Sequence, residues 1–153
     1  MSEVEIRILG RDDAAVLDAV GEDVFDNAID PATAKEFLAD PRHHLSVAID
    51  GGVVVGFASG VHYVHPDKPP ELWINEVGVA STHRGRRLGK AILAALIDRG
   101  RALGCTEAWV LTSRTNLPAM AMYASAGGIE APEDSVMFSF ALDDRPPNAR
   151  RDE

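Results

Sequence analysis

The sequence has only one cysteine and no long apolar run. Cys105 cannot form an internal disulfide, so we expect a fold that does not depend on an oxidising compartment. We expect the Cys105 side chain to be a small buried hydrophobic group rather than a nucleophile. No stretch approaches the roughly 20 apolar residues of a membrane-spanning helix. Residues 1–17 also lack the basic start and apolar run of a signal peptide. These absences predict a cytoplasmic protein without a membrane partner.

Positive charge is also scarce. The chain has 15 Lys and Arg residues and 24 Asp and Glu residues, which gives a formal net charge of -9. A surface of this sign repels nucleic acids and anionic membranes and attracts cations. We therefore expect no nucleic-acid partner, while the acidic balance fits a cationic substrate and simple solubility equally well.

Metal-binding patterns are missing too. The five histidines show no i, i+4 pair, and one cysteine cannot supply a cluster of ligands. We predict no metal site.

The length and the apolar content fit one domain. With 153 residues, 46% of them hydrophobic, the chain can bury a single substantial core. We expect one domain over residues 1–142. Residues 143–153 are charged and rich in proline, which predicts a disordered tail.

Periodicity predicts alternating helices and strands, hence a mixed α/β (α+β) fold. Gly51 and Gly52 after Asp50 form a hairpin turn between two apolar runs, and Asp30 is placed to cap a helix. The expected strands are 4–8, 45–49, 53–63, 72–79, 106–112 and 136–142. The expected helices are 11–25, 31–38, 88–103 and 116–126.

The segment 72–96, LWINEVGVASTHRGRRLGKAILAAL, carries the clearest chemistry. A strand leads through a basic glycine-containing turn into an apolar helix, whose first N–H groups and dipole favour a phosphate. Neither the dinucleotide pattern G-x-G-x-x-G nor a P-loop occurs here. The alternative is a basic helix start that is merely solvated.

Within this segment, the run Arg84-Gly85-Arg86-Arg87-Leu88-Gly89 resembles the coenzyme A motif R/Q-x-x-G-x-G/A of the GNAT acetyltransferases. Arg84 and Gly89 match the first and last positions. Arg87 stands where the family has its middle glycine, and Gly85 can supply part of the missing backbone freedom.

A second resemblance lies downstream. Asn116, Ala119, Tyr123 and Gly127 match the family pattern N-x-x-A-x-x-x-Y-x-x-x-G-F, with Gly128 in place of the aromatic residue. The strand ending in Glu76-Val77-Gly78-Val79 precedes the motif as the fourth strand does in the family. The VFD segment at 24–26, the run 37–63, Glu76 and the closing MFSFAL are most similar to aminoglycoside 3-N-acetyltransferases.

The resemblance implies a GNAT fold, with a mostly antiparallel mixed sheet of six to seven strands and about four helices. It also implies acetyl-CoA as the cofactor and direct attack of an amine on the thioester. The expected acceptor is an aminoglycoside or a similar small cationic amine. The alternatives are a peptide, lysine or metabolite amine, or an acetyl-CoA-binding sensor without turnover.

The resemblance also suggests residue roles. Glu76 is the candidate base, with a salt-bridged structural acid as the alternative, and Tyr123 is the candidate proton donor, with a core aromatic as the alternative. Asn75 and Glu76 can face one cleft only if a bulge interrupts the strand. Asn116 either orients the cofactor or caps its helix.

The remaining site residues fall into two sets, and a homodimer paired through residues 136–142 is a further expectation. The expected cofactor-binding residues are Val77, Gly78, Val79, Arg84, Gly85, Arg86, Arg87, Leu88, Gly89, Lys90, Asn116, Ala119, Met122 and Tyr123. The expected substrate-binding residues are Asp23, Asp26, Asp30, Glu71 and Asn75.

Overall fold

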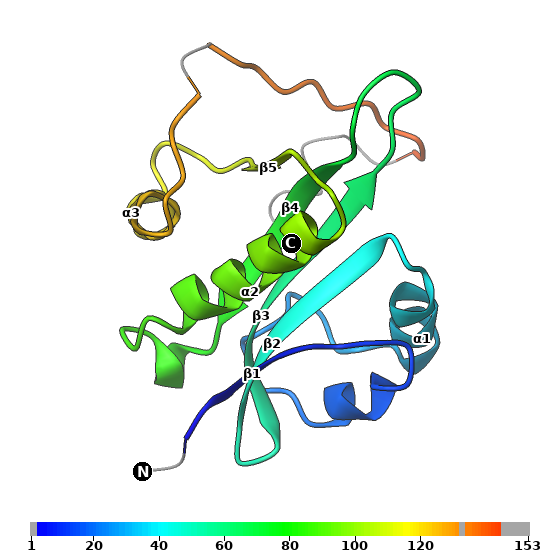
Figure 1. Cartoon of the computed structure of the whole chain (residues 1–153). Coiled ribbons are helices and arrows are strands. Elements are labelled where there is room, and N and C mark those ends of the chain that lie inside the picture. Colours follow the sequence, from blue (N-terminus) through cyan, green and yellow to red (C-terminus); the bar gives the residue numbers. More distant parts are fainter. Residues whose placement is uncertain (1–2, 132–133, 145–153) are drawn as a thin grey trace.

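The computed structural model describes residues 3–131 and 134–144, which form a sheet with helices packed against it (Figure 1). The strands follow the order β1-β2-β3-β4-β5 in the sheet. The pairs from β1 to β4 are antiparallel, and β4 and β5 are parallel. The mixed, mostly antiparallel sheet confirms the predicted fold class. The strands are β1 (Glu5–Ile8), β2 (His43–Asp50), β3 (Val53–Tyr63), β4 (Glu71–Val79) and β5 (Glu107–Val110).

Three α-helices and two short 3-10 helices are present in the described residues. The α-helices are α1 (Pro31–Ala39), α2 (Leu88–Ala102) and α3 (Leu117–Ser125); the 3-10 helices are η1 (Ala14–Asp18) and η2 (Ser81–His83). Helix α2 lies across the sheet, whereas α1 lies beside η1 and β2 (Figure 1). None of the helices in residues 3–131 and 134–144 is long and apolar enough to cross a membrane.

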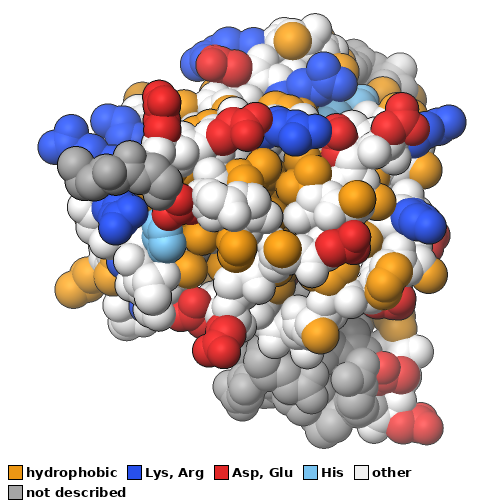
Figure 2. All heavy atoms as spheres, turned by 90° about the horizontal axis from the view of Figure 1, so that it is seen from below, with side chains coloured by type: hydrophobic (Ala, Val, Ile, Leu, Met, Phe, Trp, Pro, Cys, Tyr) orange, Lys and Arg blue, Asp and Glu red, His pale blue; other side chains and the backbone are white. Residues whose placement is uncertain are grey.

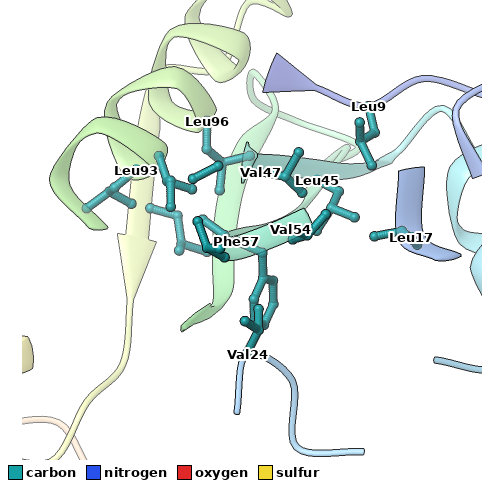
Figure 3. Close-up of a cluster of buried hydrophobic side chains, with 14 of the residues drawn as sticks. Leu9, Leu17, Val24, Leu45, Val47, Val54, Phe57, Leu93 and Leu96 are labelled. Carbon is teal, nitrogen blue, oxygen red and sulfur yellow. The ribbon is translucent and has the colours of Figure 1, made fainter. Parts of the chain in front are cut away.

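The core forms around the neighbouring strands β2 and β3, in which consecutive residues are buried. Residues on both faces of these strands are buried, so both faces of the sheet must be covered by other parts of the chain. Figure 3 shows Leu93 and Leu96 of α2 close to apolar side chains such as Val47, Val54 and Phe57. On β3, a Cβ at Gly56 would lie 2.8 Å from Ile92 Cδ1, so the glycine lets α2 approach closely. Phe57, the next residue, stacks on Phe25 with the ring centroids 4.0 Å apart.

Several predicted elements are confirmed with small changes of boundary. The β2–β3 hairpin turns at Gly51 and Gly52, both with positive φ. Asp30 caps α1 by accepting a hydrogen bond from the Ala32 N–H at 3.2 Å. The spacing of apolar residues also predicted α2 and β4 correctly, each to within one residue at its ends.

The predicted helix over 11–25 is wrong in extent, because only Ala14–Asp18 is helical and the turn is 3-10. The backbone after it pairs with β3 instead: Gly21 N donates to Val54 O at 2.9 Å, and Val54 N donates to Ala19 O at 2.9 Å. The chain therefore pairs with β3 after residue 18 and does not continue as a helix.

The predicted strand over 136–142 is also absent, since residues 134–144 hold no strand. This loss accounts for a five-stranded sheet where six to seven strands were expected, and the shortened first helix leaves three α-helices instead of about four. The tail prediction for 143–153 falls mostly on residues 145–153, which lie outside the described residues.

Candidate active site

Strands β4 and β5 diverge, and this divergence opens the site. They pair only from Glu71–Ile74 to Glu107–Val110, whereas β4 stays paired with β3 as far as Val79. Residues 75–79 therefore lie beyond the β4–β5 pairing, and the backbone edge that faced β5 is available for a ligand. Val77, Gly78 and Val79, which the sequence analysis expected to bind the cofactor, lie in this unpaired part of β4.

A β-bulge interrupts β4 just before this opening. Ser59 of β3 pairs with Glu76 and the next residue, Gly60, pairs with Ile74, so Asn75 is the extra residue. Asn75 and Glu76 are both exposed despite being neighbours on a strand. The bulge supplies the condition under which both side chains can face one cleft.

The loop before α2 forms a turn suited to an anion. Gly85 has φ 79°, and Arg87, at the N-cap of α2, is left-handed with φ 61° and ψ 20°. Arginine thus adopts a left-handed conformation that a glycine would take more easily. No side chain caps the helix at this position, and its first N–H groups favour negative charge.

A groove of about 750 Å³ runs between this loop, β4 and α3. The basic side chains of Arg84, Arg87 and Lys90 and the start of α2 suit phosphates, and the open backbone of β4 suits an extended amide arm, so the groove fits coenzyme A. Of the expected cofactor residues, all but Arg86 and Tyr123 line it. The lining residues are Val77, Gly78, Val79, His83, Arg84, Gly85, Arg87, Leu88, Gly89, Lys90, Asn116, Pro118, Ala119, Ala121, Met122 and Ser125.

Four of these lining residues were missed by the sequence analysis: His83, Pro118, Ala121 and Ser125. Pro118, Ala121 and Ser125 are spaced at three and four residues, which places them on one side of α3. Helical spacing from Met122 would have found this set. His83 is held in place by Asp50, whose Oδ2 lies 2.7 Å from its Nε2.

Close packing between α2 and α3 forms one wall of the groove. A Cβ at Gly89 would lie 2.6 Å from Met122 Sδ, so glycine allows the two helices to meet here. Asn116 caps α3, because its Oδ1 accepts a hydrogen bond from the Ala119 N–H at 3.3 Å. Asn116 also lines the groove, so both of its expected roles remain compatible with its position.

Tyr123 does not line the groove, unlike Ala121, Met122 and Ser125 on the same helix. Its side chain is half-buried and packs against the hydrophobic core. Burial raises its pKa, so the phenol remains protonated at neutral pH. The placement matches the core-aromatic alternative, while the proton-donor role remains a prediction.

A smaller acidic pocket of about 280 Å³ adjoins the groove. Three carboxylates line it: Asp23 and Asp26 from the loop before α1, and Glu76 from β4. Partial burial, and secondly the charge of Asp26, raise the pKa of Glu76. A carboxylate with a raised pKa is a better proton acceptor, which suits a base.

The other expected substrate residues lie elsewhere. Asp30 is engaged in capping α1, and Glu71 Oε2 lies 2.6 Å from His65 Nε2 at the far end of β4. Neither of them lines the acidic pocket, and nor does Asn75. In the described ranges, 3–131 and 134–144, no group of three or more His, Cys, Asp or Glu side chains is placed to hold a metal ion.

Comparison with known proteins agrees with this geometry. The Acetyltransferase (GNAT) family profile matches residues 15–127. The N-alpha-acetyltransferase RimI of Mycobacterium tuberculosis is 34% identical over 104 residues, which cover 68% of this chain and 63% of that protein. The L-2,4-diaminobutyric acid acetyltransferase of Virgibacillus pantothenticus is 35% identical over 77 residues, covering 50% of this chain and 47% of the relative. The chain thus spans about half to two thirds of the length of these relatives.

Solved structures share the fold. An aminoglycoside acetyltransferase from an uncultured soil metagenomic sample superposes with a TM-score of 0.75 at 19% identity, covering 92% of this chain and 97% of its own. Aminoglycoside N-acetyltransferase AAC(6')-Iy, solved with CoA, gives a TM-score of 0.73 at 22% identity, covering 94% and 97%. The latter is named for the 6' position, so the narrower likeness to 3-N enzymes gains no support here.

The family match also bears on the cofactor, because GNAT acetyltransferases use acetyl-CoA, as the sequence motifs predicted. The matched region contains the acidic pocket, the bulged strand, the basic loop and all of α3. On this basis the chain belongs to the acetyltransferase (GNAT) family.

Proposed function

We propose that this protein transfers an acetyl group from acetyl-CoA to a small cationic amine. The observation that carries the proposal is a shared wall: Val77, Gly78 and Val79 line both the groove and the acidic pocket. A thioester lying along this part of β4 would meet an amine held by the carboxylates. No covalent link to the protein is needed when the two reactants meet directly.

Different residues of the chain are proposed to bind the cofactor, to activate the amine and to protonate the leaving group. The start of α2, with Arg84 and Lys90, holds phosphates, and the backbone N–H groups of 77–79 can polarise a carbonyl oxygen. Glu76 takes the proton that makes the amine nucleophilic. Tyr123 is proposed to protonate the departing thiolate. Acetyl-CoA, when bound, supplies the activated acyl group.

The acceptor we favour is an aminoglycoside or a similar small polyamine, bound by a single ring or an alkylammonium arm. Three carboxylates in a pocket of about 280 Å³ support this class, because ammonium groups offset the charge of clustered acids. The overall acidity adds less support, since the acidic side chains in Figure 2 are scattered over the visible face. Acetylation of an aminoglycoside would place the protein among antibiotic-resistance enzymes.

A peptide N-terminus is the second candidate acceptor. The 34% identity to RimI over two thirds of the chain favours it. An acetyl-CoA sensor without turnover is a third candidate, but Arg87 adopts a left-handed backbone conformation that a glycine at this position would also allow, so the departure from the motif argues less strongly for loss of activity.

The first experiment measures thiol release from acetyl-CoA with sisomicin, spermidine, 2,4-diaminobutyrate and an alanine-terminated peptide. Preferential turnover of sisomicin or spermidine supports the polyamine class. Preferential turnover of the peptide would replace it with the second candidate. Coenzyme A binding without thiol release from any amine would overturn the enzymatic proposal.

Glu76→Gln tests the base. We expect kcat to fall by roughly 10²-fold, most severely at low pH where more of the amine is protonated, while the Kd for coenzyme A stays unchanged. Glu71→Gln is the matched control, since Glu71 pairs with His65 outside the pocket. Equal rates in Glu76→Gln and wild type would exclude Glu76 as the base.

We also propose a cytoplasmic location, because the fold needs no disulfide and Cys105 is a free, half-buried thiol whose pKa is raised by burial.

A further inference from the structure

Arg84 lies between the two halves of the site. It lines both the groove and the acidic pocket. Its Nε donates a hydrogen bond to the Val79 carbonyl at 3.3 Å, and its guanidinium lies 4.0 Å from Asp23 Oδ2. One cation thus contacts the acceptor side of the site while it sits at the first position of the phosphate-binding loop.

Asp23 is held independently of Arg84. The Ser81 N–H donates to both carboxylate oxygens of Asp23, at 3.0 and 3.3 Å. Hydrogen bonds from the side chain and the backbone of Ser81, with a smaller contribution from Arg84, lower the pKa of Asp23. The carboxylate therefore stays in place and charged at neutral pH when Arg84 moves away.

The contact between Arg84 and Asp23 is loose enough to be exchanged. The side chains are 67% and 46% exposed, and such pairs contribute little to stability. A pyrophosphate at the start of α2 offers more negative charge and bidentate geometry, which arginine prefers. Gly85 follows directly, with φ 79°, and a Cβ added there would have no neighbour within 4 Å, so the space beside Arg84 is open on this side.

We propose that Arg84 exchanges Asp23 for the phosphates of the cofactor, so that filling the groove frees Asp23 to hold the acceptor's ammonium group. The inference rests on the proposed function for the identity of the two ligands. In the free protein the positive charge of Arg84 offsets the negative charge of Asp23, one of the three carboxylates in the acidic pocket. Once it turns to the phosphates, the pocket gains one uncompensated negative charge. By reciprocity, each ligand then strengthens the binding of the other.

Calorimetric titration with coenzyme A tests the exchange without any acceptor. Asp23→Asn keeps an oxygen for the Ser81 N–H but releases Arg84, so the Kd for coenzyme A should fall by about 2- to 5-fold, as expected for loss of an exposed ion pair. Asp26→Asn is the matched control, because it removes the same charge from the same pocket. Its effect on this Kd should be less than half as large.

A double-mutant cycle separates exchange from a general change of electric field. Arg84→Gln should weaken coenzyme A binding, and adding Asp23→Asn to it should give no tightening. Equal effects of Asp23→Asn and Asp26→Asn, or tightening that persists in the Arg84→Gln background, would overturn the proposal. Absence of thiol release in the amine panel would overturn the proposed function instead, since the cycle reads only coenzyme A binding.

Discussion

Arg87 has a left-handed backbone conformation that costs a non-glycine residue about 1 kcal/mol. Arg87→Gly should therefore raise the free energy of unfolding by about 0.5–1 kcal/mol, part of the gain being offset by the greater freedom of glycine in the unfolded chain. Urea denaturation measures the change. Arg86→Gly is the control, because it removes the same side chain at a position without positive φ and should lower stability. A destabilised Arg87→Gly would contradict the strain.

His44 is the second residue whose environment has a measurable consequence. It is 4% exposed, and its Nε2 lies 2.7 Å from His62 Nδ1. Burial, followed by the charges of His62 and Arg99, lowers its pKa from 6.5 to about 4. The neutral imidazole is thus the form that the fold accommodates.

This shift predicts loss of stability in acid. Between pH 6.5 and 4 the unfolded chain binds a proton at His44 that the folded chain does not bind, so the free energy of unfolding decreases as the pH falls. The total loss approaches about 3 kcal/mol below pH 4. Urea denaturation at several pH values should show a shallower decline in His44→Phe than in wild type. His43→Gln, on the same strand, should keep the wild-type decline; identical profiles for all three would refute the assignment.

At the scale of elements, the site depends on how closely the loop before α1 crosses β4. A Cβ at Gly78 would lie 2.6 Å from the Val24 carbonyl oxygen and 2.9 Å from a ring carbon of Phe57. The first of these neighbours is backbone, which cannot turn aside as a side chain can. Glycine is therefore required at this crossing, where the loop brings Asp23 and Asp26 to Glu76.

Gly78→Ala should push this loop away from β4. We expect a loss of roughly 1–3 kcal/mol in the free energy of unfolding, the range for overpacking, together with a higher KM for the amine. Thermal denaturation and steady-state kinetics report the two effects. Gly10→Ala is the control, because its Cβ would lie at an ordinary 3.5 Å from Asp13 Oδ2. Wild-type stability in Gly78→Ala would show that the crossing is not tight.

For the whole molecule, residues 136–142 present an apolar surface. Alternate residues Val136, Phe138, Phe140 and Leu142 are 78%, 80%, 79% and 90% exposed. Met137 between them is 59% exposed as well, and contiguous exposed apolar side chains mark association surfaces. We therefore keep the prediction of a homodimer in which this segment contributes to the interface.

Sedimentation velocity tests the prediction. Wild type should sediment as a dimer, and the double substitution Phe138→Ser with Phe140→Ser should shift it toward monomer. Val53→Ser, which changes an exposed apolar residue in the β2–β3 turn region, should leave the dimer intact. A monomeric wild type would rule out the predicted dimer.

Local sequence was sufficient wherever the signal lies within a few neighbouring residues. Three such features were predicted correctly: the cap at Asp30, the glycine turn at 51–52 and the apolar spacing of α2. Each depends on residues that are close together in the sequence. The residues from Arg84 to Gly89 were likewise expected to lie together at one site, and all but Arg86 line the groove, because loop and helix start are contiguous in the chain.

Only the tertiary structure decided which distant residues share a site. The sequence suggested five candidate substrate residues; Asp23 and Asp26 meet Glu76, while Asp30 and Glu71 are engaged elsewhere. It predicted a helix at 11–25, but pairing of residues 19–21 with β3 ended it. By itself the sequence determined the family and the cofactor motif, since these depend on contiguous residues. Strand divergence, the bulge at Asn75 and the packing of loop against sheet determined the acidic pocket, because these contacts join residues far apart in the chain.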